Sequence, residues 1–176
     1  MPETLIHPPK TMLEVWERLP EGTLCQLINN KLIMSPASII IHQQILNEIN
    51  IEISNFLRKN PIGKLFISPI DVHFSDENIL QPDLLFIENK NLNIVHKKRL
   101  YGTPNLIIEI LSPSTSQLDF EEKKSVYERF GVQEYFIVDP NTKSVDSFFL
   151  INNKFEQQKD LTGKIDSKIL GTKILF

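Results

Sequence analysis

The chain has 176 residues, 41% of them hydrophobic and 23% charged, which is typical of one globular domain with a substantial core. A formal net charge of −3 excludes a global positive field, so binding a polyanion would require a local basic patch or a metal. The single cysteine, Cys25, excludes an internal disulfide framework. Because no basic, apolar leader and no apolar run of membrane-spanning length occurs, we expect a cytoplasmic protein.

We expect residues 1–176 to form a single domain with three parts. Residues 1–20 would be an N-terminal arm followed by a short helix, which Thr11 caps. Residues 21–160 would form the core, and residues 161–176 a tail packed along the edge of the domain.

Alternating and short apolar runs predict the first strands of the core. Residues 24–28 and 31–34 predict a hairpin turned at residues 29–30, two asparagines that tolerate positive φ. Residues 64–74 predict one long strand, in which Pro69 marks a bulge or an edge position because proline cannot donate to the ladder.

A long helix is predicted from Ser38 to about Leu57, between the hairpin and the long strand. Its buried stripe consists of Ile41, Ile45, Ile49, Ile53 and Phe56. His42 lies on this stripe and has two interpretations. It is either a neutral core histidine with one hydrogen bond, or a group that contacts a site or its substrate.

Residues 106–111 and 135–138 each predict a strand buried on both faces, because both are short apolar runs bounded by proline or glycine. A helix over residues 119–130 joins them into a βαβ unit. Glu109 lies inside the first of these strands. A carboxylate there is costly unless it is paired, hydrogen-bonded or bound to a metal.

Lys123 lies near the centre of the apolar stripe of that crossover helix. The stripe consists of Phe120, Val126, Tyr127 and Phe130. Lys123 therefore either joins Glu109 in a buried charge constellation, or runs its stem along the sheet and keeps its amine in water.

Asp83 begins the apolar run 84–87, directly after a proline, where an aspartate often satisfies nearby backbone amides. The alternative is that Asp83 converges with Glu109 and Lys123. Two acids can hold a divalent cation through hard oxygen ligands, and such a cation lowers the pKa of a bound water. A nearby lysine can then stabilise a negatively charged transition state.

The spacing of these residues resembles the Uma-type restriction endonuclease family, of the PD-(D/E)xK nuclease superfamily, over about residues 24–149. The pattern that carries the resemblance is Pro82-Asp83, Pro104-x-Leu-x-x-Glu109-x-Leu-Ser112-Pro113-Ser114, Asp119-x-x-x-Lys123-x-x-x-Tyr127-x-x-x-Gly131-Val132-x-Glu134-Tyr135 and Val138-Asp139-Pro140. It implies a restriction-endonuclease-like core of the α+β or α/β class, in which helices flank a bent mixed sheet preceded by an N-terminal hairpin and a long helix.

The resemblance also implies a Mg²⁺- or Mn²⁺-dependent endonuclease that hydrolyses DNA. By that likeness Asp83 and Glu109 bind the metal, and His42 matches an auxiliary histidine of the long helix. The superfamily lysine usually stands two residues after the second acid, where this chain has Leu111; the family takes it from the following helix, where Lys123 matches.

One departure leaves a second function open. The family's first hairpin commonly carries a glutamate and Asp-Gly, where this chain has Gln26 and Asn29-Asn30, and glutamine cannot act as an anionic ligand. The chain could therefore be a catalytically inactive binding or assembly module on the same fold. A third interpretation is that Asp83, Glu109 and Lys123 form a structural ion-pair network without metal. Such a network would show direct lysine–carboxylate contact and no open cleft.

A basic cluster at residues 96–99 is the candidate contact to DNA. Its cations Lys97, Lys98 and Arg99 would meet the phosphate backbone with modest, salt-sensitive affinity, unless they form only a solvated face. A homodimer would suit the cutting of both strands of a duplex, although the sequence indicates no interface.

Overall fold

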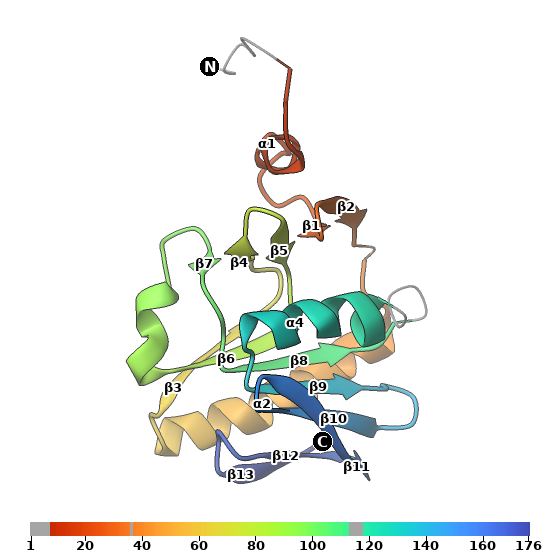
Figure 1. Ribbon diagram of the computed structural model, residues 1–176. Coiled ribbons are helices and arrows are strands. Elements are labelled where there is room, and N and C mark those ends of the chain that lie inside the picture. Colours follow the sequence, from red (N-terminus) through yellow and green to blue (C-terminus); the bar gives the residue numbers. More distant parts are fainter. Residues whose placement is uncertain (1–7, 36, 113–117) are drawn as a thin grey trace.

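The computed structural model describes residues 8–35, 37–112 and 118–176, and only the backbone of residues 119, 159 and 160 (Figure 1). The helical elements are α1 (Met12–Glu17), α2 (Ile40–Lys59), the 3₁₀ helix η1 (Asn89–Ile94), the π-helical turn η2 (Asp119–Lys123) and α4 (Lys124–Phe130). The strands are β1 (Cys25–Ile28), β2 (Lys31–Met34), β3 (Gly63–Ile67), β4 (Val72–Ser75), β5 (Asn78–Leu80), β6 (Leu84–Glu88), β7 (Leu100–Tyr101), β8 (Leu106–Ile110), β9 (Glu134–Val138), β10 (Ser144–Ile151), β11 (Lys154–Thr162), β12 (Lys164–Ser167) and β13 (Thr172–Leu175). Within the described ranges, no helix is long and apolar enough to cross a membrane.

Two mixed sheets and a terminal hairpin make up the fold. The larger sheet has six strands in the order β11-β10-β9-β8-β6-β3, with β8 and β9 parallel and the other pairs antiparallel. The smaller sheet has the order β2-β1-β5-β4-β7, and β12 pairs with β13. α4 crosses one face of the larger sheet and α2 crosses the opposite face (Figure 1). The expected hairpin, long helix and mixed sheet between helices are all present.

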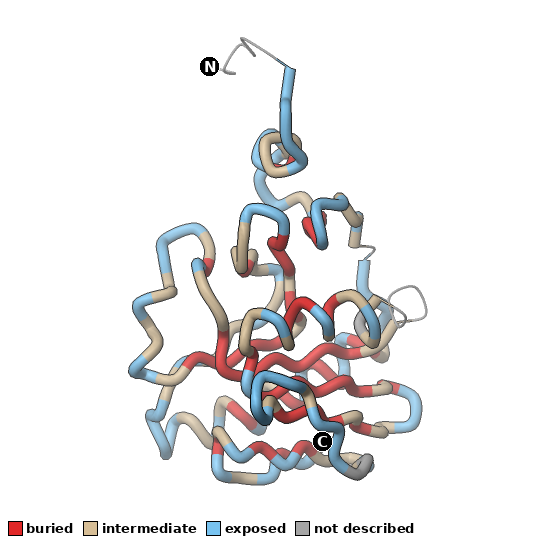
Figure 2. Tube along the Cα trace, viewed as in Figure 1, coloured by how far each residue is buried: buried red, intermediate tan, exposed pale blue. Residues whose placement is uncertain are grey.

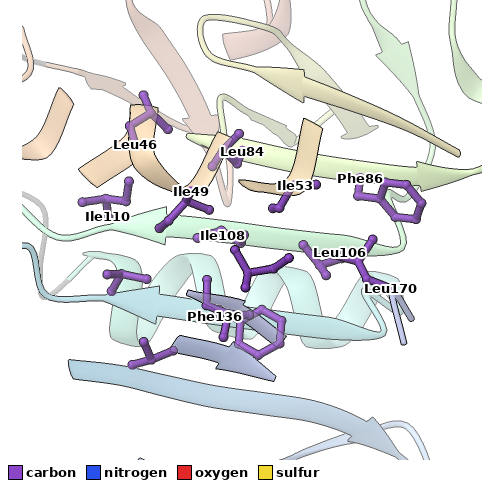
Figure 3. Close-up of a cluster of buried hydrophobic side chains, with 14 of the residues drawn as sticks. Leu46, Ile49, Ile53, Leu84, Phe86, Leu106, Ile108, Ile110, Phe136 and Leu170 are labelled. Atoms are coloured by element: carbon purple, nitrogen blue, oxygen red, sulfur yellow. The ribbon is translucent and has the colours of Figure 1, made fainter. Parts of the chain in front are cut away.

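The larger sheet sends alternate side chains to its two helices. Leu84, Leu106 and Ile108 pack with Ile49 and Ile53 of α2, and Figure 3 shows these side chains between helix and sheet. Every residue of β8 and β9 is buried, as expected for the centre of the sheet (Figure 2). This helix-covered face forms the main hydrophobic core.

The other face of the sheet packs against α4. Leu85, Ile107 and Tyr135 lie in one buried cluster with Val126 and Tyr127 of that helix. Because successive strand residues point to opposite faces, the residue two places after Ile107 also faces α4. That residue is Glu109, so the βαβ unit points the Glu109 side chain toward the crossover helix.

The expectation of one long strand over residues 64–74 is wrong. The chain forms β3 in the larger sheet and β4 in the smaller sheet, and Pro69 lies between them. Proline lacks the backbone N–H that a continuing ladder needs, so pairing ends there and the chain crosses from one sheet to the other. Ser68 N donates to Asp83 O at 2.9 Å beside this crossing.

The C-terminal segment, expected to be a tail packed along the domain edge, contains β-structure. β11 extends to Thr162, and the β12–β13 hairpin then places Ile165, Leu170 and Ile174 in the core beside α2. These apolar side chains alternate with polar ones, which is the pattern of a half-buried hairpin.

Glu134 fixes this hairpin to the larger sheet from a buried position in β9. Its carboxylate accepts hydrogen bonds from Ser167 Oγ at 2.6 Å, from Lys168 N at 2.8 Å and from Ile169 N at 3.0 Å. Burial raises the pKa of Glu134 above its usual value, although these hydrogen bonds oppose the rise.

Glu134→Ala should lower the free energy of unfolding by about 2–4 kcal/mol, because it leaves buried donors without an acceptor. Glu134→Gln keeps an acceptor and should change it by less than about 1 kcal/mol. Urea unfolding followed by circular dichroism measures both values. Equal losses in the two variants would show that hydrogen bonding at this carboxylate is not the cause.

The raised pKa gives this comparison a pH dependence with a defined sign. The folded state disfavours the Glu134 carboxylate, so the group's favourable contribution is fully present below its unfolded pKa and is lost as pH rises through its folded pKa. The stability of the wild type relative to Glu134→Gln should therefore fall as pH rises from the acid range toward neutrality.

Candidate active site

An open cavity of about 680 Å³ lies where α2, the end of β8, η2 and the N-terminal hairpin meet. His42, Asp83, Glu109 and Lys123 all contribute to its wall. These four residues come from α2, the residue before β6, β8 and η2. The fold therefore brings every site residue expected from the sequence to one cavity.

Glu109 and Lys123 form a buried ion pair at this cavity. Lys123 Nζ lies 3.0 Å from Glu109 Oε1, and the two side chains are only 5% and 2% exposed. Tyr127 OH donates to the same Oε1 at 2.7 Å. Lys123 is therefore held on the inward face of its helix and does not extend its amine to bulk water.

Tyr127 contacts a candidate site residue, Glu109, and the sequence did not single it out for this role. It lies one helical turn after Lys123 on the predicted apolar stripe. Its aromatic ring there indicates a core residue, and the pattern does not show that its hydroxyl needs a polar partner. Its (i, i+4) spacing from Lys123 was the available signal, since such residues share one helix face.

Lys123 ends a π-helical turn that leads directly into α4. Such wide turns are rare and occur frequently at functional sites. The change of helical register therefore falls at Lys123, immediately before α4.

Asp83 and His42 form the second polar pair of the cavity. Asp83 Oδ2 accepts a hydrogen bond from Ile110 N at 2.8 Å and lies 3.1 Å from His42 Nε2. Because a carboxylate only accepts, we assign the proton to Nε2. Nδ1 is buried without a hydrogen-bond partner among the described residues. His42 thus has the single hydrogen bond of a core histidine and also lines the cavity.

Gln26 occupies another part of the wall and is fully engaged. Its Nε2 donates to Ser35 Oγ at 3.0 Å, and its Oε1 accepts from Gln81 N at 2.9 Å. The side chain therefore ties the first hairpin to the segment that precedes Asp83. It offers no negative charge to the cavity.

The donor set fits a magnesium-like ion. In the part of the chain that the structure describes, no three His, Cys, Asp or Glu side chains gather into a complete metal cage. Mg²⁺ is usually bound by one or two carboxylates together with water and substrate phosphates, so Asp83 and Glu109 suffice. Asp83 Oδ1 has no hydrogen-bond partner among described residues and can accept a cation.

The cavity has features of two of the alternatives drawn from the sequence. The direct contact between Lys123 and Glu109 is that of a structural network, whereas the open cavity beside them is that of a site. The basic cluster does not line this cavity; Lys97 and Lys98 are exposed, and Arg99 is partly buried beside α1.

The arrangement of sheets and helices defines the class of the protein as restriction-endonuclease-like. A solved structure described as a "putative nuclease belonging to DUF820" from Anabaena variabilis ATCC 29413 matches with a TM-score of 0.70. That match covers 85% of this chain and 84% of that chain at 22% identity, so it supports the fold alone.

The family follows from the sequence match. The Uma2 family, described as "Putative restriction endonuclease", matches residues 12–168, and the chain belongs to this family. No curated protein matches the chain in sequence. The resemblance seen in the motif spacing is thereby confirmed.

Lys123→Met should lower the free energy of unfolding by about 3 kcal/mol, because it leaves Glu109 charged and buried without its cationic partner. Adding Glu109→Gln to the same chain should restore most of that loss. Lys124→Met, a change at the partly exposed neighbour, is the matched control and should cost less than about 1 kcal/mol. Urea unfolding of the four proteins tests this, and equal stabilities for the Lys123 and Lys124 variants would contradict it.

Proposed function

We propose that this protein is a Mg²⁺- or Mn²⁺-dependent endonuclease that hydrolyses phosphodiester bonds in DNA. One observation carries the proposal: a single open cavity gathers two carboxylates, one ammonium and one imidazole from four separate segments. Membership of a family described as restriction endonucleases supports the same reaction class.

Asp83 and Glu109 would hold the metal. A bound divalent cation would supply Lewis acidity, activating a water and offsetting charge on the phosphate. Hydrogen bonds orient both carboxylates: Ile110 N donates to Asp83, and Tyr127 OH donates to Glu109. Two carboxylates against one ammonium also leave the cavity formally acidic, which favours a cation.

Lys123 would stabilise the negative charge that develops on the phosphate. Its amine is buried beside Glu109, where water screens a charge poorly and electrostatic attraction is strong. The contact with Glu109 holds the flexible lysine stem in one position, so little reorganisation is needed during the reaction. His42 has an auxiliary role, since it orients the Asp83 carboxylate.

DNA would approach through the basic cluster, in which Lys97 and Lys98 are exposed and Arg99 is partly buried. One small cluster in an acidic protein predicts binding that weakens as salt rises. A homodimer would bring two such cavities to one duplex and allow both strands to be cut.

A non-catalytic module on the same fold is the second candidate. It is favoured by Gln26, which stands where the family's hairpin commonly carries glutamate and whose amide is hydrogen-bonded within the protein. Such a module would bind nucleic acid without cutting it.

Purified protein should nick supercoiled plasmid at low salt only when Mg²⁺ or Mn²⁺ is present. Glu109→Gln, which keeps the volume of the side chain, should reduce the rate at least about 100-fold. Agarose-gel conversion of supercoiled to open-circular DNA measures the rate. Equal activity in the two proteins would indicate a contaminating nuclease.

Calorimetric titration with Mn²⁺ separates the two candidates if no nicking occurs. A nuclease with an unknown target should bind the metal and lose it in Glu109→Gln. A chain that binds no metal and cuts no DNA would exclude the nuclease and leave the binding module.

Tyr127→Phe should weaken Mn²⁺ binding by about 10- to 100-fold, because groups that orient metal ligands contribute that much to affinity. Calorimetry measures the affinity, and thermal unfolding checks the fold. Tyr135→Phe is the control, since it removes a second fully buried tyrosine hydroxyl from the same cluster, away from the cavity wall. Equal metal affinity in both variants would remove Tyr127 from the site.

A further inference from the structure

A second cavity of about 350 Å³ adjoins the candidate active site. Pro69 and Gln81 line both cavities, so the two share a wall at the crossing between the sheets. The second cavity also borders α1, which lies beside β1 and β2 (Figure 1), and the basic loop that precedes β7. The two cavities are therefore neighbours, with these two residues between them.

Arg99 is held at this second cavity in a fixed orientation. Its Cζ lies 4.8 Å from the ring centroid of Trp16 and 6.0 Å from that of Tyr101. Trp16 is itself anchored, because its Nε1 donates to Cys25 O at 3.0 Å and it is only 9% exposed. The guanidinium therefore stacks on a rigid aromatic platform.

The guanidinium of Arg99 has neither an ion pair nor a hydrogen bond within the described ranges. Lys98, which lines the same cavity, likewise has no partner there. A stacked guanidinium keeps its planar set of N–H donors in position for a bidentate anion such as phosphate. Two cations that form no ion pair with any described residue can offer their N–H donors to an anionic group.

Carboxylates on the other walls restrict what that ligand can be. Glu17, Glu21 and Asp71 line the same cavity, and Asp71 Oδ1 accepts from Gln81 Nε2 at 2.9 Å. With two cations and three carboxylates in its wall, the cavity is formally negative, so its basic residues can take one phosphate rather than several. A single nucleotide can place its phosphate on Arg99 and turn the amino groups of its base toward the carboxylates.

We propose that this second cavity binds the nucleotide of the substrate strand that lies next to the cut phosphodiester, with its phosphate on Arg99 and Lys98. The inference rests on the proposed nuclease function and names a binding site for its substrate. Arg99 would bind the strand before the reaction, and the residues of the first cavity would carry out the hydrolysis.

Trp16 is the single tryptophan of the chain, so its fluorescence reports directly on the second cavity. The experiment uses Glu109→Gln protein, which holds DNA without cutting it, and a fluorescein-labelled single-stranded DNA oligonucleotide. Fluorescence anisotropy gives the dissociation constant, and tryptophan emission shows whether the strand enters the second cavity. Both signals should saturate at the same DNA concentration.

Arg99→Ala should raise the dissociation constant roughly 10- to 100-fold and abolish the emission change. It should also lower the slope of log K against log salt by about one. Arg99→Lys keeps the charge but not the planar guanidinium, so its dissociation constant should lie between those of the parent protein and Arg99→Ala. Arg58→Ala, an equal charge change at the exposed end of α2, is the control and should bind as the parent does.

Binding by the parent protein with equal affinity in the Arg99 and Arg58 variants would overturn this inference and leave the nuclease proposal intact. Binding without any change in Trp16 emission would do the same. A parent protein that binds no DNA at all would overturn this inference, and the Mn²⁺ titration would decide separately whether the nuclease proposal stands. Thermal unfolding of each variant excludes loss of the fold as the cause.

Discussion

The buried ion pair between Glu109 and Lys123 is the constraint on which the rest of the structure depends. A carboxylate in the central strand of the sheet is tolerable only with a partner, and the crossover helix supplies both the ammonium and the Tyr127 hydroxyl. That requirement sets which face of the helix meets the sheet. The same requirement leaves a polar cavity at the edge of an otherwise apolar core, where α2 brings His42 to Asp83.

The four candidate site residues expected from the sequence line one cavity, although their roles stay a prediction, whereas parts of the fold differ from expectation. His42, Asp83, Glu109 and Lys123 were found as polar residues in apolar patterns, and burial without a partner is costly enough to make such positions informative. Tyr127 was not recognised because its aromatic ring fits the apolar pattern of the helix, and that pattern gives no sign of the hydrogen bond from its hydroxyl to Glu109.

The features of the fold that the sequence did not determine have a common physical origin. Pro69 predicted an interruption, but only long-range pairing decides whether an interrupted strand bulges or passes to another sheet. The final hairpin likewise depends on Glu134, which lies far from it in the chain. The stacking of Arg99 on Trp16 also joins distant segments, so no local pattern could have indicated it.

The two polar pairs of the cavity belong to parts of the chain that can open independently. Glu109 and Tyr127 are 18 residues apart within one supersecondary unit, whereas His42 and Asp83 are 41 residues apart and meet only when α2 docks on the sheet. Local unfolding proceeds through such units, so a fluctuation that lifts α2 would break the contact between His42 and Asp83 while Glu109 keeps its partners on the crossover helix. Asp83 would keep the hydrogen bond from Ile110 N, so only the His42 side of the cavity would open.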